Sequence, residues 1–250
     1  MVLVIVALFA IIFMFVAFAE DKNEIESKGV VTYAEGSVKK RNLQQEDWQN
    51  AIINTEVLGG DRVRTYLKSR AELELAKLDL VRLAPQTTVF ITKLYEETKE
   101  QKRETEVLLQ DGNLWANVGK KSEDLKFNIG TPIAGMAVTG TVLRTGFDAD
   151  STTELKVYQG TVILTNAPQR NDLQPRSIVP YEIEGPHEIP GPHEVTLEEW
   201  ALIVKSMQKV KVAKNGQLVS SGNFSLQDAD ENSNWVKWNL ERDKAAQKLH

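Results

Sequence analysis

The sequence predicts a mainly β protein that ends in a short α-helical tail. Through the middle of the chain, apolar residues alternate with polar ones at the period of two that is typical of half-buried strands. A spacing of apolar residues around a glycine also recurs three times there. Beyond a proline-rich stretch, apolar residues recur at helical spacing. These observations predict a β-domain at residues 29–165, a linker at residues 166–194 and a helical segment at residues 195–250.

The alternation is clearest in short runs that are bounded by Gly, Pro, Asn or Asp. Ala71 and Leu73 alternate with Arg70, Glu72 and Glu74. Successive side chains of a strand point to opposite faces, so we expect the apolar residues in a core and the three charged residues on a solvated surface. The same alternation occurs at residues 81–83, 89–91 and 155–157.

Three segments repeat one pattern, in which two inward residues lead to a glycine and another inward residue follows two positions later. Glycine suits a corner because it adopts positive φ at no steric cost. The copies are unevenly spaced, so they do not indicate a regular short-period repeat, and we expect a compact fold of stacked or folded-over strands. The three copies are Val31, Tyr33, Gly36 and Val38; Val107, Leu109, Gly112 and Leu114; and Leu155, Val157, Gly160 and Val162.

Residues 1–19 form an unbroken apolar run that stops at Glu20 and Asp21. Ala17-Phe18-Ala19 fits the small-x-small pattern that signal peptidase cleaves, although the basic residues usual at the start of a signal peptide are missing. The run is also close to the ~20 residues that span a bilayer. We therefore expect an exported protein, periplasmic or otherwise extracytoplasmic, whose N-terminal segment is either cleaved or kept as a membrane anchor.

Proline placement separates the β-domain from the tail. Six of the eight prolines fall between Pro168 and Pro192, which predicts an extended linker. In the tail, Thr196 and Glu199 form a capping-box pattern ahead of apolar residues at helical spacing. A second helix is expected from about residue 234 into the 240s. It carries Trp235 and Trp238, two large side chains expected to dock on the β-domain.

Several motifs of the β-domain, in the same order, resemble those of the FecR family. Leu58-Gly59-Gly60-Asp61-Arg62-Val63-Arg64-Thr65, followed by Ser69-Arg70-Ala71-Glu72-Leu73, is similar to the signature of that family. The later segments Val81-Arg82-Leu83-Ala84-Pro85, Thr131-Pro132-Ile133-Ala134 and Val138-Thr139-Gly140-Thr141 resemble its next elements. The residues that carry the resemblance are Gly60, Asp61, Thr65, Ser69, Ala71, Leu73, Pro85, Gly112, Thr131, Pro132, Gly140, Thr141 and Gly160.

The resemblance implies a domain built largely of strands, with a β-solenoid-like core, that acts outside the cytoplasmic membrane. The best-known members of this family sense an occupied outer-membrane receptor and transmit that state to a sigma factor. Two departures bear on this role. The apolar run begins at Met1, so we expect no cytoplasmic anti-sigma segment ahead of it, and Thr139 stands where the family usually has an arginine.

Composition argues against several kinds of chemistry. The chain has no cysteine, which excludes thiolate nucleophiles, disulfides and iron–sulfur clusters. Its three histidines, His187, His193 and His250, form no recognisable triad motif, and no P-loop, dinucleotide-binding or nucleophile-elbow motif occurs. A net charge of −5 gives no reason to expect nucleic acid as a partner. We therefore expect no catalytic residue, no cofactor and no metal.

Three local features leave other interpretations open. Gly185-Pro186-His187-Glu188 and its near copy at residues 191–194 could supply metal ligands, although exposed turns are favoured. Glu72 and Glu74 could form a glycosidase pair, but they are expected to face solvent. The mixed-charge run at residues 95–104 is expected to be a loop or hairpin tip, with a partner surface as the alternative.

These observations favour an exported, non-enzymatic envelope protein that serves as a binding or scaffold module. Its expected partner is another envelope protein or a polysaccharide, and it would meet a membrane only through residues 1–19. A FecR-type signal-transducing regulator without the cytoplasmic segment is the alternative. A carbohydrate-active enzyme is a more distant one.

Overall fold

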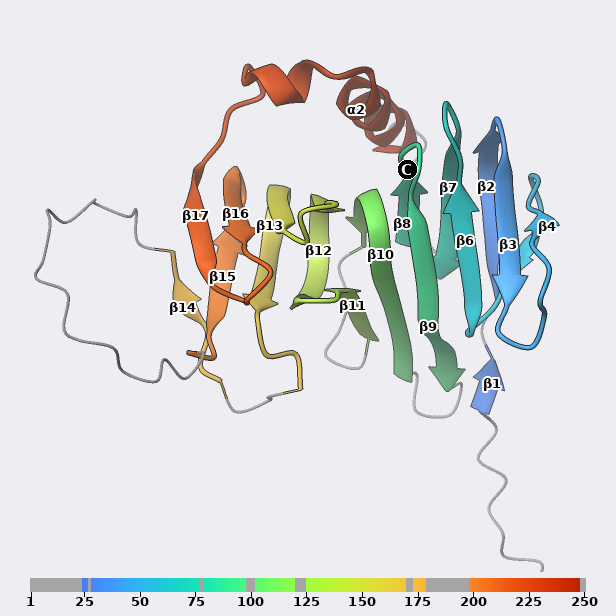
Figure 1. The fold of residues 1–250 in the computed structure, drawn as a ribbon, viewed down its shortest axis with the longest axis horizontal. Coiled ribbons are helices and arrows are strands. Elements are labelled where there is room, and N and C mark those ends of the chain that lie inside the picture. Colours follow the sequence, from blue (N-terminus) through green and yellow to red (C-terminus); the bar gives the residue numbers. More distant parts are fainter. Residues whose placement is uncertain are drawn as a thin grey trace, which may run out of the picture.

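The computed structural model describes residues 24–26, 28–76, 79–97, 102–119, 125–169, 173–178 and 198–247 (Figure 1). Four features expected from the sequence lie outside these residues. They are the apolar segment 1–19, most of the proline-rich linker, the His187 and His193 repeats, and the centre of the mixed-charge run at residues 95–104.

The described residues form a mainly β structure with one α-helix near the C-terminus, as predicted. A 3₁₀ turn, η1 (Ala229–Asn232), and the helix α2 (Asn234–Gln247) follow the last strand. The strands are β1 (Glu24–Glu26), β2 (Gly29–Glu35), β3 (Val38–Asn42), β4 (Gln49–Asn50), β5 (Glu56–Val57), β6 (Asp61–Thr65), β7 (Arg70–Ala76), β8 (Asp79–Leu83), β9 (Thr88–Glu97), β10 (Lys102–Val118), β11 (Leu125–Thr131), β12 (Ala134–Phe147), β13 (Thr153–Thr165), β14 (Arg176–Ser177), β15 (Ala201–Lys205), β16 (Gln208–Val212) and β17 (Leu218–Asn223).

The strands pair into an open sheet that is folded over into two layers. The first layer runs in the order β2, β7, β8, β10, β12, β13, β16 and β17. The second runs β4, β3, β6, β9, β10, β11, β12, β13, β15 and β14. The long strands β10, β12 and β13 belong to both layers. These pairings do not show the solenoid that the family resemblance implies.

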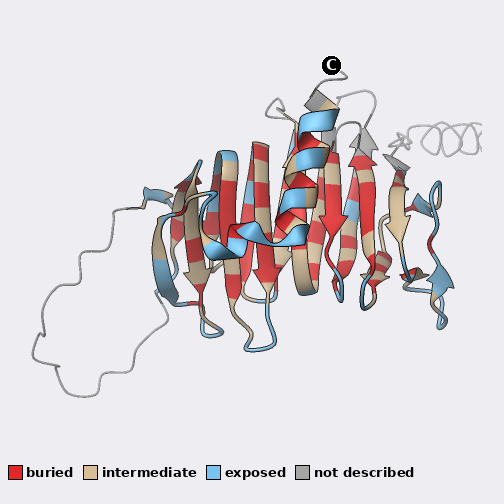
Figure 2. Ribbon diagram, turned by 90° about the horizontal axis from the view of Figure 1, so that it is seen from above, coloured by how far each residue is buried: buried red, intermediate tan, exposed pale blue. Residues whose placement is uncertain are grey.

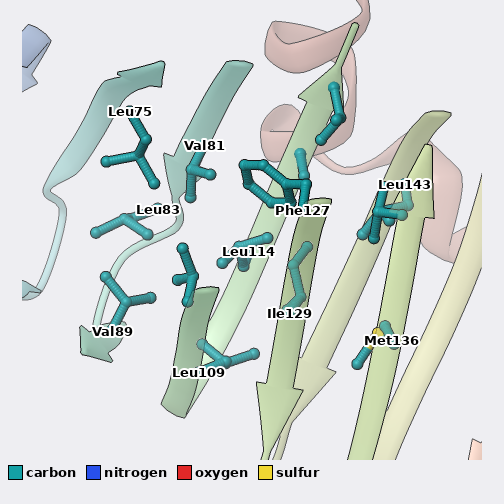
Figure 3. Close-up of a cluster of buried hydrophobic side chains, with 14 of the residues drawn as sticks. Leu75, Val81, Leu83, Val89, Leu109, Leu114, Phe127, Ile129, Met136 and Leu143 are labelled. Carbon is teal, nitrogen blue, oxygen red and sulfur yellow. The ribbon is translucent and has the colours of Figure 1, made fainter. Parts of the chain in front are cut away.

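The core lies between the two layers and follows from the period-two pattern. Each strand turns its apolar side chains inward, and those of the two layers meet in one buried cluster. Figure 3 shows part of this cluster, to which both layers contribute. Its labelled members are Leu75, Val81, Leu83, Val89, Leu109, Leu114, Phe127, Ile129, Met136 and Leu143.

Glycine corners mark the fold line, as the repeated pattern predicts. Gly36, Gly112 and Gly160 have φ values of 71°, 90° and 89°. A Cβ atom on Gly112 would stand 2.4 Å from Thr87 Oγ1 and 2.7 Å from the Gln86 carbonyl oxygen. Both the backbone conformation and the close approach therefore require glycine there. The bends let one strand leave the first layer and continue in the second.

The first of the two predicted C-terminal helices is wrong. β15 and β16 occupy the positions after the Thr196–Glu199 capping pattern, and both strands pair with β13. The apolar residues at helical spacing include the β-branched Val204, and the neighbouring Ile203 is also β-branched, and both favour a pleated sheet. β16 also alternates at a period of two, with Val210 and Val212 buried. The predicted second helix is confirmed as α2, and Ser233 caps it through a hydrogen bond from the Val236 N–H.

Candidate functional site: two outer faces of the folded sheet

A continuous row of polar and aromatic residues crosses the outer face of the first layer. Each member is the cross-strand neighbour of the next, so the row spans seven strands from β2 to β16. In strand order, this outer row consists of Tyr33, Glu72, Arg82, Trp115, Arg144, Lys156 and Lys209.

Residues 224–247, here named the C-terminal strap, lie across this outer row. Figure 2 shows the strap passing in front of the strands, with α2 at its end. Asp243 of α2 accepts hydrogen bonds from Arg82 Nη1 at 2.7 Å and from Trp115 Nε1 at 2.9 Å. It also accepts one at 2.9 Å from the Asn117 side chain. One strap carboxylate therefore satisfies three donors on two strands.

Glu72 is the second anion at this end of the row. It accepts hydrogen bonds from Arg82 Nε at 2.5 Å, Arg242 Nη2 at 2.7 Å and Thr32 Oγ1 at 2.8 Å. Burial alone would raise the pKa of Glu72, but the hydrogen bonds from Arg242 and Arg82 outweigh it and lower that pKa to about 2. The prediction that Glu72 lies on a solvated surface is wrong, because the strap leaves it only 4% exposed.

A second set of contacts joins the strap to the other end of the row. Glu231 of η1 accepts hydrogen bonds from Lys156 Nζ at 2.9 Å, Arg144 Nη2 at 3.1 Å and Tyr158 Oη at 2.6 Å. Asp230 contacts the same Lys156 and Arg144 side chains. Burial raises the pKa of the Tyr158 phenol, so this group remains a neutral donor to Glu231. Lys156 is 2% exposed, and two carboxylates stabilise its charge.

Aromatic side chains fill the space between these charges. Trp238 lies with its ring centroid 5.3 Å from that of Tyr33, and it stacks on Trp235 at 5.4 Å. The guanidinium groups of Arg242 and Arg70 lie 5.2 and 4.9 Å from the Trp238 ring centroid. These contacts confirm that the helix docks on the β-domain through its tryptophans. The strap is therefore part of the folded domain.

The outer face of the second layer carries a different group, here named the basic cluster: Lys39, Arg41, Trp48, Arg62 and Arg64. On the paired strands β3 and β6, Lys39 lies opposite Arg64, and Arg41 lies opposite Arg62. Among the described residues, none of these four cations forms a salt bridge. All are half-buried by their neighbours and reach solvent.

The contacts of the basic cluster are with aromatic rings and neutral oxygens. The guanidinium carbons of Arg41 and Arg64 lie 5.0 and 4.7 Å from the ring centroid of Trp48. Arg62 lies 4.7 Å from the Phe90 ring centroid. Arg64 Nε also donates a hydrogen bond to Thr88 Oγ1 at 3.0 Å. Stacking fixes the planar groups and leaves most of their N–H donors free.

The motif residues that suggested a family lie at turns and corners rather than on either outer row. Asp61 Oδ2 accepts hydrogen bonds from the Leu58 N–H and from Lys40 Nζ, both at 2.9 Å. Thr65 Oγ1 donates to the Ala84 carbonyl oxygen at 2.5 Å and accepts from the Thr87 N–H at 3.0 Å. These bonds close the turns at the two ends of β6.

The remaining hydroxyl groups of the motif act in the same way. Ser69 Oγ accepts a hydrogen bond from the Ser37 N–H at 2.8 Å, beside the Gly36 corner. Thr131 Oγ1 lies 2.8 Å from Thr153 Oγ1, and Thr141 Oγ1 donates to the Thr161 carbonyl oxygen at 2.9 Å. The other motif residues are the buried Ala71 and Leu73, the turn residues Pro85 and Pro132, and the positive-φ Gly60, Gly112, Gly140 and Gly160.

The sequence motifs did not predict either charged group on the outer faces. Arg62 and Arg64 stand two residues apart, as do Lys39 and Arg41, and this spacing places each pair on one strand face. The basic cluster could therefore have been recognised from this spacing. Arg82 and Lys156 are single charged residues inside apolar runs, and nothing local to them indicates that a distant segment covers them.

Within the described ranges, no group of three or more His, Cys, Asp or Glu side chains is placed to hold a metal ion. No helix in those same ranges is long and apolar enough to cross a membrane.

Comparison with known proteins identifies the β-domain. Two crystal structures of a candidate anti-sigma factor from Parabacteroides distasonis ATCC 8503 resemble the chain, with TM-scores of 0.43 and 0.42 and identities of 15% and 14%. Each match covers 68% of this chain and 62% of the other, so the chain spans less than two thirds of their length. No curated protein matches. Residues 61–163, from β6 through most of β13, match the family model described as FecR protein, and the chain therefore carries a FecR-family domain.

Proposed function

We propose that this chain is an exported, non-enzymatic protein-binding module of the cell envelope. The observation that carries the proposal is the basic cluster, an accessible group of three arginines, a lysine and a tryptophan on a rigid sheet. Arginine and tryptophan are the residues most enriched among those that dominate binding energy at protein interfaces. The strap closes the opposite face, so the open face is the better candidate for a partner.

The structure around the cluster supports binding by a preorganised surface. β3 and β6 are paired along their whole length, and their inward residues Val38, Val63 and Thr65 are buried in the core or its corners. Trp48 lies against two guanidinium groups, so the side chains start close to one arrangement. Preorganisation of this kind reduces the entropy that binding must offset.

Site-specific photo-crosslinking in cells tests the proposal. A photoreactive amino acid is placed at position 62 of the full chain, and in a control at position 126, where Lys126 is an exposed residue of β11. We expect a discrete protein adduct from position 62 that is absent from position 126. The absence of any adduct specific to position 62 would contradict the proposed function.

A second candidate is a signal-transducing regulator, supported by the match of residues 61–163 to the FecR family. A regulator also binds proteins, so the two candidates differ in the consequence of binding. Deletion of the gene, followed by measurement of transcripts, separates them. A regulator predicts a defined set of transcripts that changes on deletion and is restored by the full chain. A module without a signalling role predicts unchanged transcription.

A further inference from the structure

The basic cluster holds cations together at a measurable cost. Like charges directly opposite each other on paired strands destabilise the sheet. This sheet contains two such pairs side by side, Lys39 with Arg64 and Arg41 with Arg62. No carboxylate of the described chain relieves either pair. Anions that come from outside the domain would stabilise this arrangement of charges.

The opposite face shows how this protein neutralises cations on a strand. Arg82, Arg144 and Lys156 each contact carboxylates of the C-terminal strap at hydrogen-bonding distance. There the anions come from an acidic segment, with Asp230 and Glu231 adjacent and Asp243 on the following helix. The basic cluster has the same kind of cations on the same kind of surface, but no acidic segment among the described residues forms salt bridges with it.

The positions of the four cations set the spacing that bound anions would need. Directly opposed residues lie about 5 Å apart, and alternate residues of one strand about 7 Å apart. Four positive charges therefore occupy a roughly rectangular area whose dimensions match acidic side chains at alternate positions of an extended segment, or three to four residues apart on a helix. Guanidinium groups with free N–H donors bind carboxylates through paired hydrogen bonds.

We propose that the basic cluster binds an acidic segment of a partner protein, in the way that the outer row binds the strap. This inference rests on the proposed binding function and specifies its partner. A neutral polysaccharide is disfavoured because its sugar rings need free aromatic faces, and Arg41 and Arg64 already lie over Trp48. The exposed Leu67 follows β6 closely and adds an apolar contact of the type that protein interfaces include.

Titration of the full chain with a fluorescent peptide tests the recognition chemistry. The probe is a 14-residue peptide with glutamate at alternate positions, and a peptide with glutamine in their place is the neutral control. The variant is Arg62→Glu with Arg64→Glu. Its matched control is Lys205→Glu with Lys214→Glu, which changes the net charge equally at two exposed lysines that belong to neither the outer row nor the basic cluster.

We expect the acidic peptide to bind with an affinity that falls as salt rises, and the Arg62/Arg64 variant to lose at least tenfold in affinity. The Lys205/Lys214 control should stay within twofold of the wild type, and the neutral peptide should bind at least tenfold more weakly. An equal loss in both double variants would overturn the inference, because net charge alone would then explain binding. The milder Arg62→Gln with Arg64→Gln variant gives the same comparison if the reversal perturbs folding.

Vesicles containing phosphatidylglycerol and the polysaccharide polygalacturonate serve as competing anions. Tighter, cluster-dependent binding to either one than to the peptide would assign the cluster to a membrane or a glycan and refute a protein partner. The photo-crosslinking above separates the two proposals. An adduct from position 62 to a segment without acidic residues would refute this inference and leave the binding function standing, whereas no adduct at all removes the function itself.

Discussion

The outer row and the basic cluster place similar residues on two faces of one folded sheet. On the row, Arg82 and Lys156 lie 1% and 2% exposed beneath a strap that supplies their counter-ions. In the cluster, Arg62 and Arg64 reach solvent and contact aromatic rings. The same pattern of alternating charge on a strand therefore has two outcomes, which depend on whether a distant segment of the chain returns to cover it.

The charges of the two faces differ in what they contribute to the stability of the domain. A buried charge that loses its partner leaves another charge unpaired in a medium of low polarity, so each contact beneath the strap is needed for stability. A cation that reaches solvent keeps much of its hydration, so the cluster contributes little to folding and remains accessible to a partner. The proposed function therefore places stability and binding on opposite faces of the same domain.

The largest expected effect comes from replacing one arginine on each face. Arg82→Met removes the partner of both Glu72 and Asp243, and we expect the free energy of unfolding to fall by about 3–5 kcal/mol. Arg62→Met, on the open face, should change it by less than about 1 kcal/mol, because the lost contact with Phe90 is offset by relief from Arg41. Urea unfolding measures both. Similar losses for the two variants would remove the distinction between the faces.

Acid should weaken the covered face through Glu72. Its pKa lies at about 2 in the folded protein and near 4.5 when unfolded, so its stabilisation is complete above pH 4.5 and is lost as the pH falls towards 2. The difference between these values corresponds to about 3 kcal/mol at neutral pH.

The test of this acid effect compares the wild type with Glu72→Gln across pH 2–6. Other carboxylates titrate in both proteins, so the relevant quantity is the difference between their unfolding free energies at each pH. That difference should shrink by about 3 kcal/mol from pH 6 to pH 2. A constant difference would show that Glu72 is not held as a buried anion by Arg82 and Arg242.

A smaller effect should appear when the strap is loosened without removing a cation. Asp243→Asn keeps the shape of the side chain but removes its charge and one of its two acceptor oxygens, so Arg82 and Trp115 cannot both keep their acceptor, and we expect a loss of about 1.5–3 kcal/mol. Hydrogen exchange of the backbone amides of α2 should speed up at least tenfold, with less change in β12 and β13. Equal acceleration throughout would mean that the strap and the sheet open together.

How far the sequence could predict this structure depends on the range of the interactions. The glycine corners and the inward apolar residues follow from local spacing, and Gly36, Gly112 and Gly160 all turn as predicted. Helical spacing in a short apolar run misled at β15, because Ile203 and Val204 also fit a strand that β13 pairs with from a distance.

The two candidate surfaces differ in the same respect. The alternate cations of β3 and β6 are visible in the sequence, although their mutual opposition depends on the pairing register. The outer row cannot be recognised as one group in the sequence. Its seven members come from seven strands, and the strap carboxylate that contacts Arg82, Asp243, lies 161 residues further along the chain. No pattern in either segment indicates that partner.

The smallest expected effect is also the one of opposite sign. Lys39→Gln removes a cation that lies opposite Arg64 and whose ammonium group is 5.8 Å from the Tyr66 ring centroid, so stability should rise by a few tenths of a kcal/mol at low salt. The gain should vanish near 1 M salt, where the screening length falls to about 3 Å. Lys156→Gln is the counterpart beneath the strap, and it should destabilise at every salt concentration. Destabilisation by Lys39→Gln would mean that the open face is balanced within the chain, and the reason to expect an acidic partner there would disappear.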